Sequence, residues 1–371
     1  MGYNNNDSPA KVLVGVQEAD FSAYKADNTA QFAAIIIPRN SIVIATNDAS
    51  QREKNGADIV LTGSADQDLI NTAIASLPNT SPLVGGSIRI GRGNVSISSP
   101  ILTDRSCDLS GVAGGTRVKL ANSSNCSMLE YHHASNNQQQ HAKLQNMIFL
   151  GNLSGNTGVH YGIDLCPTTE VDYVRDLTIE NVWVDSMQGH GIGTSNAIAS
   201  AAHHVLLSHC SFEHNALDGV NINTNAEITL YDVLLYGNMG SGFRHSASAG
   251  LVKVTNCHLE ANAQYGLVIT SGNVLTNYPA GHVAIIGNKF YNNATYVGSG
   301  YSQLVAAGIG GIYMGNTVTD DGTLTHSKYG IEEGSAGDYN IIANNIIKTT
   351  AISGNLHVVG THTVNANNIS I

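Results

Sequence analysis

The stretch from Asn181 to Ile192, which reads N-V-W-V-D-S-M-Q-G-H-G-I, contains the pattern that decides the fold. After the polar Asn181, apolar residues stand at alternate positions, Val182 and Val184, and the pair Gly191 and Ile192 closes the stretch. Alternation with a period of two is typical of a β-strand that buries one of its faces. We therefore expect a strand whose valines enter a core and whose intervening side chains point outward.

The same frame recurs at a nearly fixed spacing. A glycine followed by an apolar residue lies at Gly162, Gly191, Gly219, Gly242 and Gly266, which are 29, 28, 23 and 24 residues apart. Ten residues before the last four glycines stands a polar residue, and apolar residues alternate on both sides of it. These polar residues are Asn181, His209, Asp232 and Asn256. Repeats of about 25 residues with an aligned polar corner indicate the coils of a solenoid, stacked about 4.8 Å apart.

The two ends of the chain depart from this regular frame. Residues 1–57 are interpreted as a small N-terminal segment in which 51–56, Q-R-E-K-N-G, form a solvated connector. Residues 58–371 are interpreted as the solenoid domain, with its clearest coils at 142–295. Residues 293–336 exceed one coil, so we expect either the wall of a groove or a long turn there.

One helix is predicted, over residues 64–77. Ser64 and Gln67 fit a capping box at its start, and Pro78 follows its end. Its apolar residues recur at helical spacing, at Leu69, Ile70, Ala73, Ile74 and Leu77. We expect this helix to cover the first coil, whose edge is otherwise open.

The repeats resemble those of the right-handed parallel β-helix proteins of the pectate-lyase-like superfamily. The segment from A-D-I-V-L (57–61) through the helix to G-G-S-I-R-I-G-R-G (85–93) looks like the entry of phage tailspike and polysaccharide-depolymerase β-helices. The resemblance implies an all-β fold, a right-handed parallel β-helix with an N-terminal capping helix, over about 58–371. It specifies chemistry less well, because hydrolases, lyases, epimerases and adhesins share the repeat.

A column of polar side chains is predicted on the outside of the coils. The register gives the outward pairs Trp183/Asp185, Ser211/Glu213, Leu234/Tyr236 and His258/Glu260, and the next coil adds Tyr291. Sugar rings stack on Trp and Tyr, and glycosidic cleavage commonly uses two carboxyl groups. We therefore predict Asp185, Glu213 and Glu260 as catalytic residues. Trp183, Tyr236 and His258 are predicted to bind substrate.

The spacing of these carboxylates bears on the stereochemistry of cleavage. Asp185 and Glu213 lie on adjacent coils, near the ~5 Å of retaining glycosidases. Glu213 and Glu260 lie two coils apart, near the ~9.5 Å upper limit of inverting pairs. The alternative is that this column is only the solvated face of a solenoid.

A second predicted cluster, His190, Asp218 and Arg244, lies beside the glycines and completes the predicted substrate-binding set. The superfamily resemblance implies that lyases neutralise a uronate carboxylate with Arg, Lys or Ca²⁺ while a base abstracts a proton. Arg244 with His190, His245 or Tyr236 would supply such parts. The alternative is that Arg244 merely pairs with Asp218 or a neighbour at the surface.

Composition limits the partners. The net charge is −11, which argues against nucleic acid, and no apolar run approaches the roughly 20 residues of a membrane helix. The five cysteines show no C-x-x-C pair and are expected to be free, mostly buried thiols. No metal site is predicted, and no cofactor beyond Ca²⁺ in the lyase alternative. No signal segment is visible, so work outside a cell requires a removed leader or a virion-borne route.

Two classes of function therefore remain. The preferred one is an extracellular, secreted or virion-associated enzyme that cleaves an acidic or neutral polysaccharide, with hydrolysis favoured over β-elimination by a lyase or epimerisation of a uronan. The second is a non-catalytic carbohydrate-binding adhesin or fibre. The resemblance to tailspikes is consistent with a homotrimer.

Overall fold

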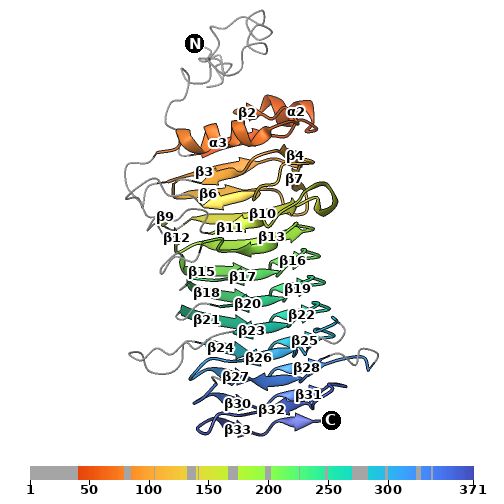
Figure 1. The fold of residues 1–371 in the computed structure, drawn as a ribbon. Coiled ribbons are helices and arrows are strands. Elements are labelled where there is room, and N and C mark those ends of the chain that lie inside the picture. Colours follow the sequence, from red (N-terminus) through yellow and green to blue (C-terminus); the bar gives the residue numbers. More distant parts are fainter. Residues whose placement is uncertain are drawn as a thin grey trace, which may run out of the picture. The chain divides into compact units, whose positions relative to one another are not determined.

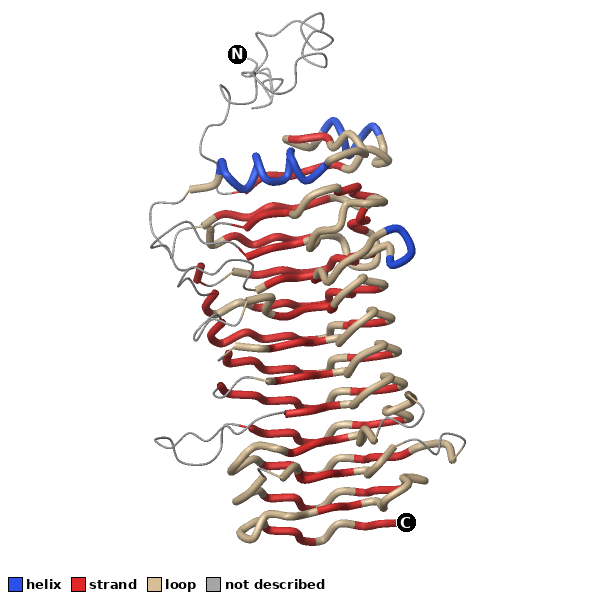
Figure 2. The backbone as a smooth tube through the Cα atoms, in the orientation of Figure 1, coloured by secondary structure: helices blue, strands red, loops and turns tan. Residues whose placement is uncertain are grey.

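The computed structural model describes residues 41–78, 85–103, 105–131, 139–140, 142–165, 174–196, 202–224, 226–246, 250–269, 283–296, 300–322, 327–335 and 337–371. Residues Asn40–Ile371 form one compact unit, and almost all of its regular structure is β-strand (Figure 1, Figure 2). Strands of successive coils pair in parallel register. The predicted all-β solenoid is confirmed.

The described strands form two sheets, one of 24 strands and one of 10. The larger sheet contains β1 (Ser41–Ala45), β2 (Ile59–Val60), β3 (Gly86–Ile90), β4 (Gly93–Ile97), β6 (Cys107–Ser110), β7 (Thr116–Leu120), β9 (Gln139–Gln140), β10 (Lys143–Leu150), β12 (Val174–Arg175), β13 (Thr178–Asp185), β15 (Ala202–Ser208), β16 (Ser211–Glu213), β18 (Ala226–Tyr231), β19 (Leu234–Tyr236), β21 (Gly250–Thr255), β22 (His258–Glu260), β24 (Val283–Ile286), β25 (Lys289–Tyr291), β27 (Ile312–Met314), β28 (Thr317–Thr319), β30 (Ile341–Ala343), β31 (Ile346–Lys348), β33 (Val364–Ala366) and β34 (Ile369–Ser370). The smaller sheet contains β5 (Ile101–Thr103), β8 (Leu129–Tyr131), β11 (Tyr161–Asp164), β14 (His190–Gly193), β17 (Val220–Ile222), β20 (Phe243–His245), β23 (Leu267–Ile269), β26 (Leu304–Ala306), β29 (Ile331–Glu333) and β32 (Leu356–His357). Among the described residues, the helices are α2 (Gln51–Asn55), α3 (Asp66–Ser76) and a short 3-10 turn at Leu153–Gly155.

A typical coil runs through β15, β16 and β17 before the chain enters the next coil at β18. The core is a column of apolar side chains that the register stacks inside the coils. Val184 is fully buried and pairs with Phe149 on one side and Phe212 on the other. Trp183, between two buried valines, is 38% exposed. The expected inward and outward faces of this strand are therefore confirmed.

Backbone conformation explains the polar corners. Asn181, His209, Asp232 and Asn256 have φ of 53°, 53°, 53° and 56°, in the left-handed region. Asn and Asp tolerate this region better than most residues, because their short polar side chains bond locally to the backbone. The recurrent glycines have a different cause, which is close stacking. A Cβ at Gly191 would lie 2.6 Å from the carbonyl oxygen of Gly219 on the next coil.

Asparagine also has a second role that the sequence did not reveal, as ladders of buried amides. In one ladder the side chain of Asn215 donates to Oδ1 of Asn238 at 2.8 Å, and Asn238 donates to Asn262 at 2.9 Å. A second ladder lies at a different corner of the coils, between the first and second strands of each. It contains Asn288, Asn316, Asn345 and Asn368. These amides satisfy backbone groups that the turns leave unpaired inside the coil.

The helix α3 covers the first coil, as expected, through polar side chains as well as apolar ones. Carboxylate and amide oxygens of Asp66, Gln67 and Asn71 accept the backbone N–H groups of the coil edge below, at Ser96, Ser98 and Leu102. The helix residues Ile70, Ala73 and Ile74 are buried. The open strand edge is therefore closed by hydrogen bonds to side chains.

One local expectation at this end is wrong, and a second helix was not predicted. The predicted capping box at Ser64 does not form, because the N-cap residue is Ala65, whose side chain makes no cap hydrogen bond. A capping box exists instead at Ser50, where Glu53 completes it at the start of α2. The expected connector at 51–56 is thus mostly a short helix. Strand β1, which belongs to the small N-terminal segment, pairs with β2 and β3.

The expectation for residues 293–336 also needs correction. The described part of this segment contains the strands β26, β27, β28 and β29, and their pairings continue both sheets. It is therefore neither a groove wall nor one long turn, because its described part continues the regular strands of the β-helix.

The free thiols are confirmed for the described cysteines. Cys107, Cys210 and Cys257 are buried and Cys126 is partly exposed, whereas Cys166 lies outside the described residues. Burial raises the pKa of the Cys210 thiol to about 12, so it stays protonated. None of the helices described here is long and apolar enough to span a bilayer.

Candidate functional site

A groove of about 640 Å³ lies on the outside of the larger sheet, across the strands from β10 to β22. It follows the corner where each coil bends between its first and second strands. Its lining residues are Gly114, Met147, Ile148, Asn181, Val182, Trp183, His209, Cys210, Ser211, Glu213, Asp232, Val233, Leu234 and His258. The groove therefore brings together residues that are up to 144 positions apart in the sequence (114 to 258).

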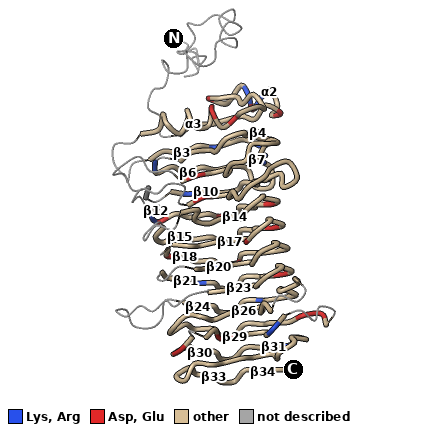
Figure 3. Tube along the Cα trace, viewed as in Figure 1, with Lys and Arg blue, Asp and Glu red and all other residues tan. Residues whose placement is uncertain are grey.

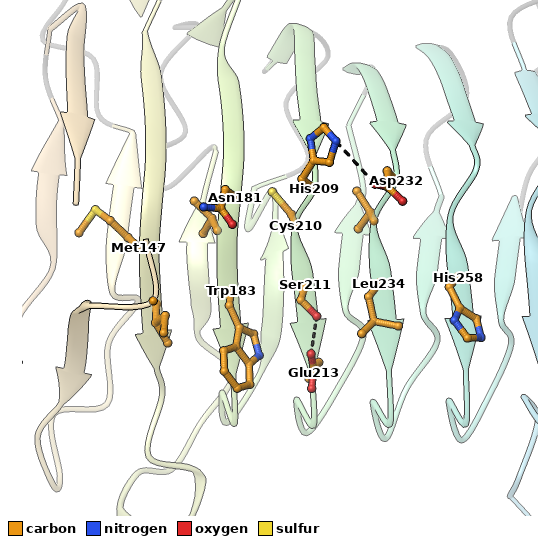
Figure 4. A pocket seen from close by; sticks show the side chains of 14 residues that line it. Met147, Asn181, Trp183, His209, Cys210, Ser211, Glu213, Asp232, Leu234 and His258 are labelled. Carbon is orange, nitrogen blue, oxygen red and sulfur yellow. Dashed lines mark hydrogen bonds and ion pairs between the residues drawn. The ribbon is translucent and has the colours of Figure 1, made fainter. Parts of the chain in front are cut away.

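One row of outward side chains runs along the groove (Figure 4). Parallel register pairs Trp183 with Ser211, Ser211 with Leu234, and Leu234 with His258, each on the next coil. The row begins with the exposed indole of Trp183, continues over the apolar Leu234 and ends at an imidazole. A flat aromatic surface followed by an apolar patch suits the apolar faces of sugar rings.

The carboxylate of Glu213 lies at the end of its strand, facing this row. The Ser211 hydroxyl donates a hydrogen bond to it, within the same strand (Figure 4). Because Glu213 is partly exposed and lines the groove, a bound ligand has access to it. This residue is the predicted catalytic carboxylate that the structure places in the groove.

The other side of the groove is formed by the polar corner residues. The Nε2 atom of His209 lies 3.6 Å from the carboxylate of Asp232 on the next coil (Figure 4). The side-chain amide of Asn181 donates to Asn146 at 2.7 Å. These side chains offer hydrogen-bonding groups opposite the apolar row.

His258 closes the row and connects the groove to the acidic column. Its Nε2 lies 3.0 Å from the carboxylate of Glu260. Burial and the positive charge of Lys289 lower the pKa of His258, although Glu260 opposes the shift. The imidazole is therefore mostly neutral near pH 7, and it offers hydrogen bonds without a full charge.

The acidic column has the predicted register but lies mostly outside the groove. Asp185 pairs with Glu213, Glu213 with Tyr236, and Tyr236 with Glu260, and Tyr291 follows. Acidic segments recur at one edge of successive coils in the middle of the stack (Figure 3). Of the column, only Glu213 is a lining residue; Asp185, Tyr236 and Glu260 stand beside the groove.

Asp185 is held in position by a neighbour on the next coil. Nδ1 of His214 lies 3.0 Å from its carboxylate, and the His214 ring packs edge-on against Tyr236 with centroids 5.2 Å apart. These contacts fix the orientation of a carboxylate one coil away from Glu213. The two carboxylates are thus adjacent, one inside the groove and one at its margin.

The second predicted cluster lies on the smaller sheet and is a closed network. The Arg244 Nε donates to Asp218 at 3.1 Å, and its Nη2 donates to Ser241 at 2.9 Å and to Gln264 at 2.6 Å. Burial alone would raise the pKa of Asp218. The interactions of its carboxylate with His190, with Arg244 and with the Ser241 N–H have the larger, opposite effect and lower this pKa to about 2. Arg244 and Asp218 therefore form an ion pair, which is the alternative interpretation of Arg244 given by the sequence.

The structure brings together some of the residues named for the lyase alternative, because Arg244 and His190 both contact Asp218. Nδ1 of His190 already accepts the N–H of Asp218 at 3.1 Å. His245 points into the core, where it is fully buried, and burial lowers its pKa to about 4. Tyr236 belongs to the other sheet. In the part of the chain that is described, no three His, Cys, Asp or Glu side chains are arranged to hold a metal ion.

Comparison with known proteins agrees with this architecture. Residues 136–296 match the family model described as a right handed beta helix region. The chain folds as a right-handed parallel β-helix. No curated protein matches it in sequence.

Several solved structures are similar to this β-helix at low identity. The A-module of the mannuronan C-5 epimerase AlgE4 from Azotobacter vinelandii is 18% identical, over 82% of this chain and 98% of that one, with a TM-score of 0.49. DFA-IIIase from Arthrobacter chlorophenolicus A6 is 12% identical, over 86% and 84% of the two chains, with a TM-score of 0.48. The ORF18 protein of Geobacillus virus E2 is 14% identical, over 84% and 59%, with a TM-score of 0.46.

Sequence reasoning missed part of what the β-helix places in the groove. His209 and Asp232 were identified only as corner residues, and Ser211 and Leu234 only as outward positions. The sequence did contain a signal for these residues. His209 and Asp232 each stand ten residues before a recurrent glycine, and Ser211 and Leu234 each stand two residues after those corners. What the pattern did not show is that the outer surface is hollow at this bend.

Proposed function

We propose that this β-helix is a polysaccharide-cleaving hydrolase that works in the groove on its larger sheet. The observation that carries the proposal is the convergence of Trp183, Glu213 and His258 from three coils on one groove. An aromatic platform beside a carboxylate is the combination that glycosidic cleavage uses. A polymer too large to cross a membrane is met outside a cell, so we place the activity there or on a virion.

The lining of the groove favours a neutral polymer. It contains the carboxylates of Glu213 and Asp232 but no Lys or Arg. A uronate or sulfated chain would bring like charge to these carboxylates without a compensating cation, and close like charges repel. A neutral sugar meets only hydrogen-bonding groups and apolar surface.

The proposed reaction uses Glu213 with Asp185. Their coils stand about 4.8 Å apart, close to the ~5–5.5 Å between carboxyl groups of retaining enzymes. Asp185 attacks the anomeric carbon as the nucleophile, while the protonated Glu213 gives its proton to the departing glycosidic oxygen. Glu213 then takes a proton from water, which attacks the same carbon, releases Asp185 and completes hydrolysis with retention of configuration.

A panel of polysaccharides tests the proposal. The purified chain is incubated with neutral polymers (a galactomannan, a β-glucan and a dextran) and with acidic ones (alginate and polygalacturonate). New reducing ends from a neutral polymer, without the ultraviolet absorbance of an unsaturated sugar, are expected. Unsaturated products would establish elimination instead, and binding without products would leave a carbohydrate-binding protein.

The stereochemistry of the first product separates the carboxylate pairs. Proton NMR during the first minutes of reaction is expected to show the anomer that retains the substrate's configuration. Initial release of the opposite anomer would contradict the pair Asp185 and Glu213, because inversion requires a wider separation of the carboxyl groups.

A further inference from the structure

We propose that the outer face of the smaller sheet contains a second sugar-binding site, which holds a neutral glycan chain without cleaving it. The site is formed by the tyrosine row, defined as Tyr265, Tyr301 and Tyr329, together with Arg244 and Lys328. It lies on a different sheet from the groove. The inference does not depend on the proposed hydrolysis.

The aromatic rings form two contacting pairs on successive coils. The rings of Tyr265 and Tyr301 meet edge to face, with centroids 4.8 Å apart. The ring of Tyr329 stacks on His357 at 4.6 Å, nearly parallel. All four side chains are partly exposed. Large aromatic rings that stay partly in water and are fixed by neighbours are suited to stacking on a ligand.

The register places two of these rings along the direction of the coils. Leu267 pairs with Leu304, and Leu304 with Ile331, so the residues two positions earlier also align. These are Tyr265, Ser302 and Tyr329. Two coils at about 4.8 Å each separate the tyrosines by roughly 10 Å. Ser302 between them is buried and donates to Glu332, so a glycan that follows the stack meets the partly exposed rings.

Both cations at this site are paired, which determines the class of ligand. Arg244 is engaged with Asp218 and with Gln264, and Nζ of Lys328 lies 2.7 Å from the carboxylate of Glu332. The pairs carry no net charge, so a polyanion gains little here. They still present N–H groups and oxygens to sugar hydroxyls, because the Lys328 side chain is 40% exposed.

The same cations also fix the rings. The Arg244 guanidinium lies 5.8 Å from the centroid of the Tyr265 ring, and the Lys328 ammonium lies 5.1 Å from that of Tyr329. Contacts between a cation and an aromatic face hold the ring in one orientation. Burial raises the pKa of Tyr265, so its hydroxyl keeps its proton and donates to a ligand. Preorganised rings lose little freedom on binding.

The test measures binding both in the parent chain and in Glu213→Gln, so its outcome does not depend on the proposed hydrolysis. Both chains are run on native gels that contain galactomannan, β-glucan, dextran or alginate, and migration gives the affinity. At least one neutral polymer is expected to slow them. Replacing both Tyr265 and Tyr329 by Ala is expected to weaken that affinity about tenfold or more, whereas replacing both by Phe changes it only a few-fold.

Controls separate this site from the groove and from a structural role. Trp183→Ala removes the platform of the groove, and binding through the tyrosine row is expected to persist in it. Circular dichroism verifies that each variant is folded. The proposal is overturned if no neutral polymer slows the chain, if the alanine pair binds as well as the parent, or if Trp183→Ala alone abolishes binding. Tighter binding of alginate through the tyrosines would overturn the ligand class.

Discussion

The buried amide ladder gives the sharpest stability prediction, at Asn238. Its side chain is 1% exposed. Its Nδ2 donates to the carbonyl of Phe212 at 3.0 Å and to Asn262 at 2.9 Å, and its Oδ1 accepts from the backbone and side chain of Asn215 at 3.2 and 2.8 Å. The substitution Asn238→Ala removes all four bonds at once. It leaves one carbonyl and two N–H donors inside the coil without this partner.

The cost follows from those orphaned groups. A buried polar group that loses its partner costs about 1–3 kcal/mol, so three of them correspond to about 3–9 kcal/mol. A water molecule that enters the vacated space restores part of this bonding. We therefore expect a loss of about 3–5 kcal/mol of local stability in the coils around Asn238.

Native-state hydrogen exchange is the suitable assay, because a solenoid unfolds locally and one melting temperature averages over its coils. The amides of β16, β19 and β22 are expected to exchange about 100-fold faster or more, while those of β3 and β4 change little. Met239→Ala is the matched control, because Met239 is the next residue in the chain and its side chain is 64% exposed. Exchange in Asn238→Ala within twofold of the parent chain would refute the reasoning.

Three further outcomes follow from other parts of the molecule. Gly191→Ala places a Cβ 2.6 Å from the carbonyl of Gly219 and is expected to cost about 1–3 kcal/mol; an unchanged thermal melt would contradict the close stacking of the coils. The pKa of Asp218 is lowered from 3.8 to about 2, so its ionised form adds about 2 kcal/mol above pH 4 that is lost as the pH falls through 2. In urea unfolding, the advantage of the parent over Asp218→Asn should therefore shrink from pH 5 to pH 2, and a constant advantage would count against the ion pair. Trp183→Ala should raise KM for the cleaved polymer about tenfold while Trp183→Phe stays closer to the parent, and equal KM values would remove the platform role.

The fold was largely predictable because a solenoid repeats one local rule. Period-two alternation and the aligned corner residues predicted which side of the strand at Val184 is buried. The equivalent strands of later coils repeat that choice as far as β31. The glycines and the left-handed corners marked the turns for steric reasons that the sequence itself carries. The capping box at Ser64 does not form because α3 begins one residue later than predicted, with Ala65 as its N-cap, and Asp66 in its first turn accepts the N–H groups of Thr62 and Gly63.

The site was predictable only in its register. Alignment of the coils placed Trp183, Glu213 and His258 on one outer surface, but the depth of that surface depends on how each coil bends, which spacing alone does not report. Asparagine shows the same limit. Its buried ladders look identical in sequence to turn residues, because only the packed coil distinguishes an amide that faces inward.

The central claim is that the groove cleaves glycosidic bonds through Glu213, and one comparison tests it most directly. Reducing-end release from the cleaved polymer is measured for the parent, Glu213→Gln and Glu260→Gln, with binding of each recorded on the same preparation. Glu260 is the matched control, because it belongs to the same acidic column but lies two coils from Glu213, too far for the retaining pair that the adjacent Asp185 forms. Loss of about 10²–10⁴-fold in Glu213→Gln with binding retained, and near-normal cleavage in Glu260→Gln, is the predicted result. Full activity in Glu213→Gln would contradict the account.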